Sequence, residues 1–287
     1  MYYTMIILSV VLFGGAFALN DVYQKQRGSS IRVSMEFLLI SSLAGLAVLL
    51  AVGGFKLECT PFTLIMALLS ALASFGFTLC TFKALGTINL SLYSLFSMLG
   101  GMVLPSVVGI AFYAEGLNVA KIVCFVLICG ALLLTVEKSE KRRGSFPYYL
   151  GIFLLNGTVG SLAKVFTAAP FPKTSPAGFT LLQALCSALL ALVALLILSK
   201  GKREPFPAVK AVGVGALFGV ANRVANYLLV VALSHVDASV QYPMVTGGVM
   251  IVSTLICFFG KNKPSKKELL SVLIAFIAML ALFLIPV

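Results

Sequence analysis

The chain has 287 residues, of which 60% are hydrophobic and only 10% are charged, and its formal net charge is +12. Soluble domains carry about a quarter charged residues, so this composition excludes a soluble enzyme with a large core. The basic residues lie in short segments between apolar runs, as they do in the loops of membrane proteins. We therefore expect the lipid bilayer, and not nucleic acid, as a partner.

Ten apolar segments follow one another, each near the length of about 20 residues that crosses a bilayer as a helix. The first has no basic residues before its apolar run, which favours a spanning helix over a cleaved signal peptide. The sequence thus predicts an all-α polytopic membrane protein with ten transmembrane helices, at residues 2–24, 33–54, 60–83, 89–113, 118–136, 146–168, 176–198, 208–233, 237–259 and 267–286.

The distribution of basic residues predicts the topology. Odd-numbered connections between the segments carry sixteen Lys or Arg residues, whereas even-numbered connections carry three. Because basic loops remain in the cytoplasm, the positive-inside rule predicts cytoplasmic odd-numbered connections and external termini in the cytoplasmic membrane.

Two stretches of the chain repeat each other. Residues 84–91 and 232–239 share an Ala-Leu pair and a Ser, and Gly100-Gly101 recurs as Gly247-Gly248. A spacing near half the chain length indicates a duplication. We expect a first five-helix repeat at residues 1–137, a cytoplasmic basic linker at 138–146 and a second repeat at 147–287. Because five is odd, the second repeat is inverted in the membrane, which places a substrate site near the midplane where the halves meet.

Short motifs in both halves resemble one transporter family. The first half has Phe82-Lys83-Ala84-Leu85, Pro105, Ala114-Glu115-Gly116-Leu117 and Gly130, and the second half has the spacing from Gly157 to Lys164. On these motifs, essentially the whole chain resembles the EamA-type repeats of the drug/metabolite transporter (DMT) superfamily. The resemblance implies a ten-helix transporter whose cavity is built largely by the third, fourth, eighth and ninth helices.

The chain also departs from that family. The second-half counterpart of Glu115 falls near Lys261, and Asp21 stands in the first half where the second has Lys164. Many family members keep both termini in the cytoplasm, opposite to the loop charges here. Neither the substrate nor the direction of transport is therefore carried over from the resemblance.

Arg223 is the deepest charged residue in a predicted span, near the middle of the eighth segment, with Asn222 beside it and Asn226 one turn away. A charge there costs about 2.5–3.5 kcal/mol on insertion scales, so it marks a candidate site. Either Arg223 binds substrate, because its planar guanidinium suits a carboxylate, or it forms a structural ion pair with Asp21 or Glu36.

Further substrate-binding candidates are polar or aromatic side chains within spans. The amides either line a cavity or bond across helices. The tyrosines follow from the helices that the resemblance places around the cavity, and packing is the alternative for them. These candidates are Asn20, Lys164, Asn156, Gln241, Tyr93 and Tyr242.

Asp21 and Lys164 hold equivalent positions in the two repeats. They are either gates, one at each face of the membrane, or charges that snorkel to the interface. Glu36 follows Arg32 by four residues, which favours an interfacial ion pair. Asp21 and Glu36 are nevertheless the candidates for gating or for proton coupling.

No catalytic or metal-binding motif is recognisable. The six cysteines contain no Cys-x-x-Cys pair, and His235 is the only histidine. We therefore expect no catalytic residues, no metal and no cofactor.

Together these patterns predict a secondary active transporter, not an enzyme, which moves a small polar metabolite by alternating access. An amino acid or related carboxylate is favoured as substrate, and we expect a monomer. One alternative is export of cationic or lipophilic drugs, which calls for an unpaired acidic residue deep in a span. The other, from a different class, is a non-transporting scaffold or receptor.

Overall fold

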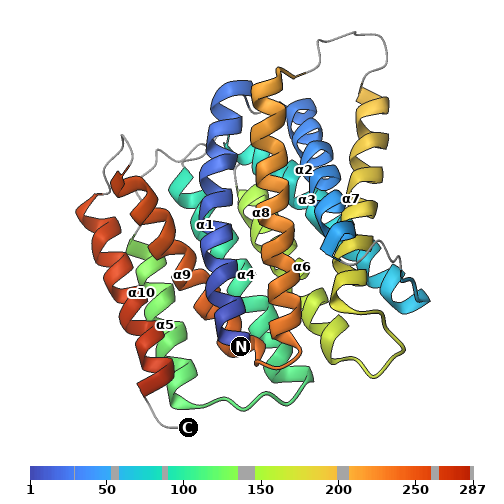
Figure 1. Ribbon diagram of the computed structural model, residues 1–287. Helices are drawn as coiled ribbons and strands as arrows, with labels where there is room; N and C mark the ends of the chain where they lie inside the picture. The colour runs from blue at the N-terminus through green and yellow to red at the C-terminus, as the bar shows by residue number, and fades with distance from the viewer. Residues whose placement is uncertain are drawn as a thin grey trace.

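A computed structural model describes residues 1–28, 30–52, 58–85, 90–134, 146–198, 207–259 and 265–284. Within these ranges the chain forms ten helices and no strand, which confirms the predicted all-helical class. The helices shown in Figure 1 are α1 (Tyr2–Arg27), α2 (Ile31–Val52), α3 (Pro61–Leu85), α4 (Leu90–Phe112), α5 (Val119–Leu134), α6 (Phe146–Ala168), α7 (Pro176–Leu198), α8 (Val209–Leu233), α9 (Ala238–Phe259) and α10 (Lys266–Leu284).

Proline and glycine mark several helix boundaries. Pro61 and Pro176 are the first residues of α3 and α7. A backbone N–H at this position has no partner within the helix, so proline loses no hydrogen bond there. Gly28 follows α1 with φ of 85°, a conformation that glycine adopts without a Cβ clash. Pro105 and Pro243, in contrast, lie inside α4 and α9.

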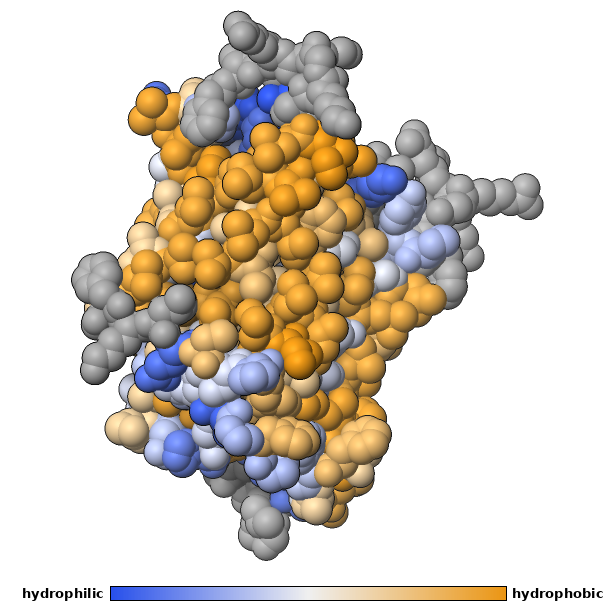
Figure 2. All heavy atoms as spheres, turned by 90° about the vertical axis from the view of Figure 1, so that its right-hand side faces the viewer, coloured by the Kyte–Doolittle hydropathy of each residue, from blue (hydrophilic) through white to orange (hydrophobic). Residues whose placement is uncertain are grey.

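The exposed surface of the bundle is apolar. Seven of the described helices are long and apolar enough to cross a membrane, and shorter apolar helices span Phe96–Phe112, Val119–Leu134 and Leu269–Ala281. Figure 2 shows apolar side chains spread over the middle of one face, with hydrophilic residues toward both ends. The outward leucines of α3 and α7 include Leu64, Leu68, Leu72, Leu189, Leu192 and Leu196. The chain is therefore a multi-pass membrane protein.

The helices pack as a central group of eight, with α5 and α10 against its α9 side. Helix α1 packs on α8 and α9, α2 on α7 and α8, α3 on α6 and α7, and α4 on α6 and α9. Helices α5 and α10 pack on each other at one edge of the bundle (Figure 1). The start of α1 and the end of α10 lie at the same end of the bundle, which we call the terminal end.

Two glycines allow the central helices to approach closely. A Cβ at Gly219 of α8 would overlap the backbone oxygen of Ser41 in α2. A Cβ at Gly100 of α4 would likewise overlap the backbone oxygen of Phe153 in α6. Small residues at such crossings bring helix backbones together, which stabilises helix pairs in a membrane.

Candidate functional site

A cavity of about 320 Å³ lies between the central helices. It is lined by side chains from α1, α2, α3, α4, α6, α7, α8 and α9, and not by the described residues of α5 or α10. Its volume lies within the range of about 300–1,000 Å³ that is usual for small-molecule sites. Four of the lining helices come from each half of the chain.

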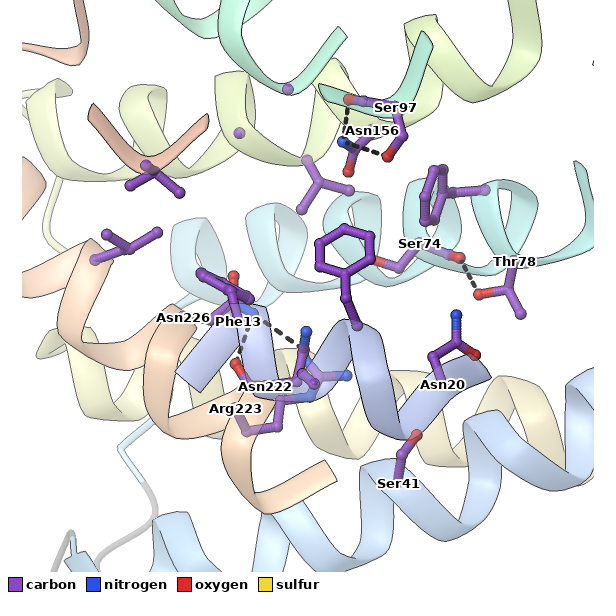
Figure 3. Close-up of a pocket in the computed structure, with 18 of the residues that line it drawn as sticks. Phe13, Asn20, Ser41, Ser74, Thr78, Ser97, Asn156, Asn222, Arg223 and Asn226 are labelled. Atoms are coloured by element: carbon purple, nitrogen blue, oxygen red, sulfur yellow. Dashed lines mark hydrogen bonds between the residues drawn. The ribbon is translucent and has the colours of Figure 1, made fainter. Parts of the chain in front are cut away.

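Arg223 is the only charged residue among the described residues that line this cavity. It is 8% exposed, and it makes neither an ion pair nor a hydrogen bond with any described residue. Figure 3 shows it on α8 beside Asn222. A Cβ at Gly45 of α2 would overlap its Cβ and Cγ atoms, so the aliphatic stem of Arg223 packs directly on that glycine.

The two acidic residues considered as partners of Arg223 are bound elsewhere. Asp21 pairs with Lys25 at 2.5 Å, and its side chain is 43% exposed. Glu36 accepts bonds from Arg27 at 2.8 Å and from Arg32 at 3.2 Å. The predicted pair of Arg32 with Glu36 is thus confirmed, whereas the structural ion pair of Arg223 with either acid is absent. Roles of Asp21 and Glu36 in gating or coupling remain predictions.

Four predicted asparagines line the cavity, namely Asn20, Asn156, Asn222 and Asn226. Asn226 donates to the backbone oxygen of Asn222 at 2.8 Å and to its side-chain oxygen at 3.1 Å. Asn156 of α6 donates to the backbone oxygen of Ser97 in α4 at 2.7 Å. These bonds orient the amides of Asn156, Asn222 and Asn226 (Figure 3).

The other predicted binding residues lie in different places. Tyr242 lines the cavity, and its hydroxyl donates to the backbone oxygen of Gly160 at 2.9 Å. Gln241 is fully buried and donates to the backbone oxygen of Leu229 at 3.0 Å, so it joins α9 to α8 without lining the cavity. The side chain of Tyr93 lies outside the described residues.

Lys164 does not line the cavity but forms a buried ion pair with Glu115 at 2.6 Å. The lysine side chain is 9% exposed and the glutamate side chain 3%. The lysine ammonium also lies 5.7 Å from the centre of the Tyr113 ring. Lys164 therefore lies at the terminal end of the bundle in an ion pair, and its ammonium does not snorkel to the interface.

Glu115 joins three elements of the fold. It lies between α4 and α5, and its carboxylate accepts bonds from the first amides of α9, at 2.7 Å from Ala238 and 2.9 Å from Ser239. A Cβ at Gly109 of α4 would lie 2.6 Å from the carboxylate carbon, so glycine is needed there to make room. A carboxylate at a helix N-terminus satisfies unpaired amides and interacts favourably with the helix dipole.

The surroundings of Glu115 keep it ionised. Burial alone raises its pKa, but the hydrogen bond from Lys164 and those from α9 outweigh this effect, so the pKa of Glu115 lies below its ordinary value. In this conformation the anionic carboxylate links α6 to α9.

Other polar contacts between the two halves gather at the same terminal end. Lys121 of α5 binds Asp237, just before α9, at 2.7 Å. Glu58, ahead of α3, accepts a bond from the Ser175 hydroxyl at 3.0 Å, and Thr63, in the first turn of α3, accepts one from the Thr174 amide at 3.0 Å. The segments between the helices are thus bonded across the halves at this end.

Sequence reasoning missed most of the hydroxyl and aromatic residues of the cavity wall. The hydroxyls of α3, Ser74, Thr78 and Thr81, follow one another by about one helical turn in an apolar span. That spacing is the signal by which they are recognisable. The phenylalanines are Phe13, Phe17, Phe37, Phe77, Phe82, Phe179 and Phe218. No group of three or more His, Cys, Asp or Glu side chains gathers among the residues that the structure describes.

Comparisons with known proteins bear on the fold alone. No protein-family model matches the sequence, and no curated protein is significantly similar to it. A solved crystal structure, described only as that of a protein, superposes with a TM-score of 0.77. The match covers 98% of this chain and 95% of that chain at 13% sequence identity. This arrangement of helices therefore occurs in an experimentally determined structure.

Proposed function

We propose that this protein is a secondary active transporter of the EamA-like drug/metabolite type, located in the cytoplasmic membrane. Its cargo is a small organic metabolite that carries a carboxylate, such as an amino acid or a related acid. The observation that carries the proposal is the cavity between the two halves of the chain, with an unpaired arginine in its wall. A buried cation without a counter-ion is costly in a scaffold, but it is suited to an anionic ligand.

The helix packing supports two inverted five-helix repeats. If each helix is exchanged for the one five positions away in the chain, the pair α1–α8 becomes α6–α3, and the pair α4–α6 becomes α9–α1. All four of these helix pairs are in contact, as are α2–α8 and the pair that it becomes, α7–α3. In Figure 1, α1 runs from the terminal end to the other end, and α6 runs in the opposite direction.

Individual contacts support the same symmetry. A Cβ at Gly14 of α1 would overlap Val252 of α9, and one at Gly157 of α6 would overlap Leu104 of α4. Gly157 follows Gly14 by the same number of residues that separates Lys164 from Asp21. Val252 likewise follows Leu104 by the same number of residues that separates Ala232 from Ala84. Inverted repeats of this kind allow one half to rock against the other around a central site.

The distribution of polar contacts supports alternating access. The terminal end is bonded across the halves by the pairs of Lys164 with Glu115 and of Lys121 with Asp237. Among the described residues of the opposite end, the ion pairs of Asp21 and Glu36 stay within the first half. We infer that this conformation is closed at the terminal end and that opening there requires the Glu115 pair to separate.

The proposal is tested by thermal stabilisation of the purified protein with a panel of amino acids, organic acids, phosphorylated metabolites and cationic drugs. Ligands that bind the folded state raise its apparent stability by RT ln(1 + [L]/Kd). We expect hits among carboxylates, their uptake into proteoliposomes, and loss of both in Arg223→Ala.

Three results contradict it. Hits confined to cations that persist in Arg223→Ala would favour a drug exporter. Saturable binding without flux of any hit would indicate a receptor. The absence of any saturable ligand would indicate a scaffold.

A further inference from the structure

The cavity wall carries one positive charge and no described negative one. Its charged member is Arg223, and no Asp or Glu occurs among the described lining residues. Lys164, a predicted substrate-binding residue, and Asp21, a predicted gating or coupling residue, are each paired outside the cavity. The net charge of the described wall is therefore that of a single guanidinium, which stays protonated in proteins.

The charge of the ligand follows from this balance. A monoanion brings the site to zero net charge, whereas a zwitterion leaves it at one positive charge and an amine raises it to two. In a cavity of low dielectric constant, each uncompensated charge is costly. The ammonium group of an amino acid finds no carboxylate in the described wall, so zwitterions and amines are disfavoured relative to a simple acid.

The remaining wall sets the character of the ligand body. Rings of α1, α2, α3, α7 and α8 contribute to it, among them Phe13, Phe37 and Phe218, with aliphatic residues of α8 and α9 beside them. Phe37 and Phe218 contact each other, with ring centres 4.6 Å apart. The polar groups nearest Arg223 along α8, Asn222 and Asn226, are already bonded to each other. Apolar ligand surface fits such walls better than a row of hydroxyl groups does.

We propose that the cavity selects monocarboxylates with an apolar or aromatic body over amino acids of the same shape. The carboxylate binds the Arg223 guanidinium through two parallel hydrogen bonds, and the body lies among the phenylalanines. This inference rests on the proposed transport function and narrows its substrate class.

The test uses four compounds that share one phenyl-bearing body and differ in charge. They are 3-phenylpropanoate, its neutral amide, phenylalanine and 2-phenylethylamine. Dissociation constants are measured on the purified wild-type protein by thermal shift and titration calorimetry. We expect 3-phenylpropanoate to bind at least about tenfold more tightly than its amide, because a charge-assisted bidentate pair is stronger than a neutral one. Phenylalanine should follow the acid, and the amine should be the weakest.

Variants at Arg223 identify the anchor. In Arg223→Met the acid should lose its advantage over the amide, and in Arg223→Lys it should keep part of it. Lys210→Met removes an exposed charge from the same helix and should leave the order unchanged. Tightest binding of phenylalanine or the amine, an unchanged preference in Arg223→Met, or no binding of the acid would each overturn the inference.

Transport of the same compounds into proteoliposomes separates the two proposals. If phenylalanine is carried better than 3-phenylpropanoate, transport stands and the preference for monocarboxylates is wrong. If 3-phenylpropanoate binds with the expected dependence on Arg223 but neither it nor any other hit crosses the membrane, the binding inference stands and the transport function fails.

Discussion

Two buried cations of this protein have opposite surroundings. Taken as whole residues, Lys164 is 7% exposed and Arg223 is 8% exposed. Lys164 has a carboxylate at 2.6 Å and an aromatic ring beyond it, whereas Arg223 has no described partner. Both lie on central helices, and burial alone does not distinguish them. The presence of a partner distinguishes them, since a paired charge holds helices together and an unpaired one is available to a ligand.

Replacing Lys164, the cation with a partner, should cause the largest loss of stability. Lys164→Met leaves the Glu115 carboxylate buried without its cation, and we expect a loss of about 3–5 kcal/mol in the free energy of unfolding. The double variant Glu115→Gln with Lys164→Met should recover much of this loss, because neither charge then remains. Chemical denaturation in detergent measures both, with Lys210→Met as an exposed control. Equal stability of Lys164→Met and wild type would show that the pair does not hold the terminal end.

A smaller effect is expected where α8 crosses α2 beside Arg223. In Gly219→Ala, the new Cβ would overlap the backbone of Ser41, which cannot move as a side chain can. We expect a loss of about 1–3 kcal/mol in stability. Gly213 lies on the same helix, and a Cβ added there would meet no atom within 4 Å, so Gly213→Ala is the matched control.

Gly213→Ala should raise the stability by about 0.5–1 kcal/mol, because alanine favours a helix over glycine. Equal effects of the two alanines would show that the α2–α8 crossing tolerates a wider separation.

Replacing Arg223, the cation without a described partner, should change the stability in the opposite direction to replacing Lys164. Arg223→Met removes a buried charge and replaces it with a flexible apolar side chain that fills irregular space. We expect the ligand-free protein to become more stable by about 1 kcal/mol, because an uncompensated buried charge is unfavourable. Thermal unfolding without ligand measures this. A marked loss of stability would mean that Arg223 has a structural partner.

The helices were predictable because their cause is local. A run of about 20 apolar residues between charged breaks specifies one spanning helix whatever its neighbours are. The asparagines and Arg223 were recognisable on similar grounds, since polar groups in a span need a reason to be there. All four predicted asparagines and Tyr242 lie on the cavity wall with Arg223.

The partner of Lys164 was not predictable, because it depends on a long-range contact. Glu115 lies in the segment between α4 and α5, and only the packing of α4 on α6 and α9 brings it to Lys164. The hydroxyls of α3 gave little signal for a different reason. The Thr78 hydroxyl donates to the Ser74 backbone oxygen at 2.8 Å, so its own helix satisfies it without any ligand.

The smallest expected effect concerns the second ion pair at the terminal end. Lys121 binds Asp237 at 2.7 Å, but the aspartate side chain is 48% exposed, and Lys121 also donates to the backbone oxygen of Gly116 at 2.7 Å. In Asp237→Asn the lysine keeps a partner, and water replaces the lost carboxylate charge. We expect a loss of less than about 1 kcal/mol, as for partly exposed pairs in general. Chemical denaturation of Asp237→Asn and Lys164→Met side by side compares the two losses in the free energy of unfolding. A loss as large as that of Lys164→Met would show that the two pairs act as one network, and that their difference in exposure does not set their relative contribution to stability.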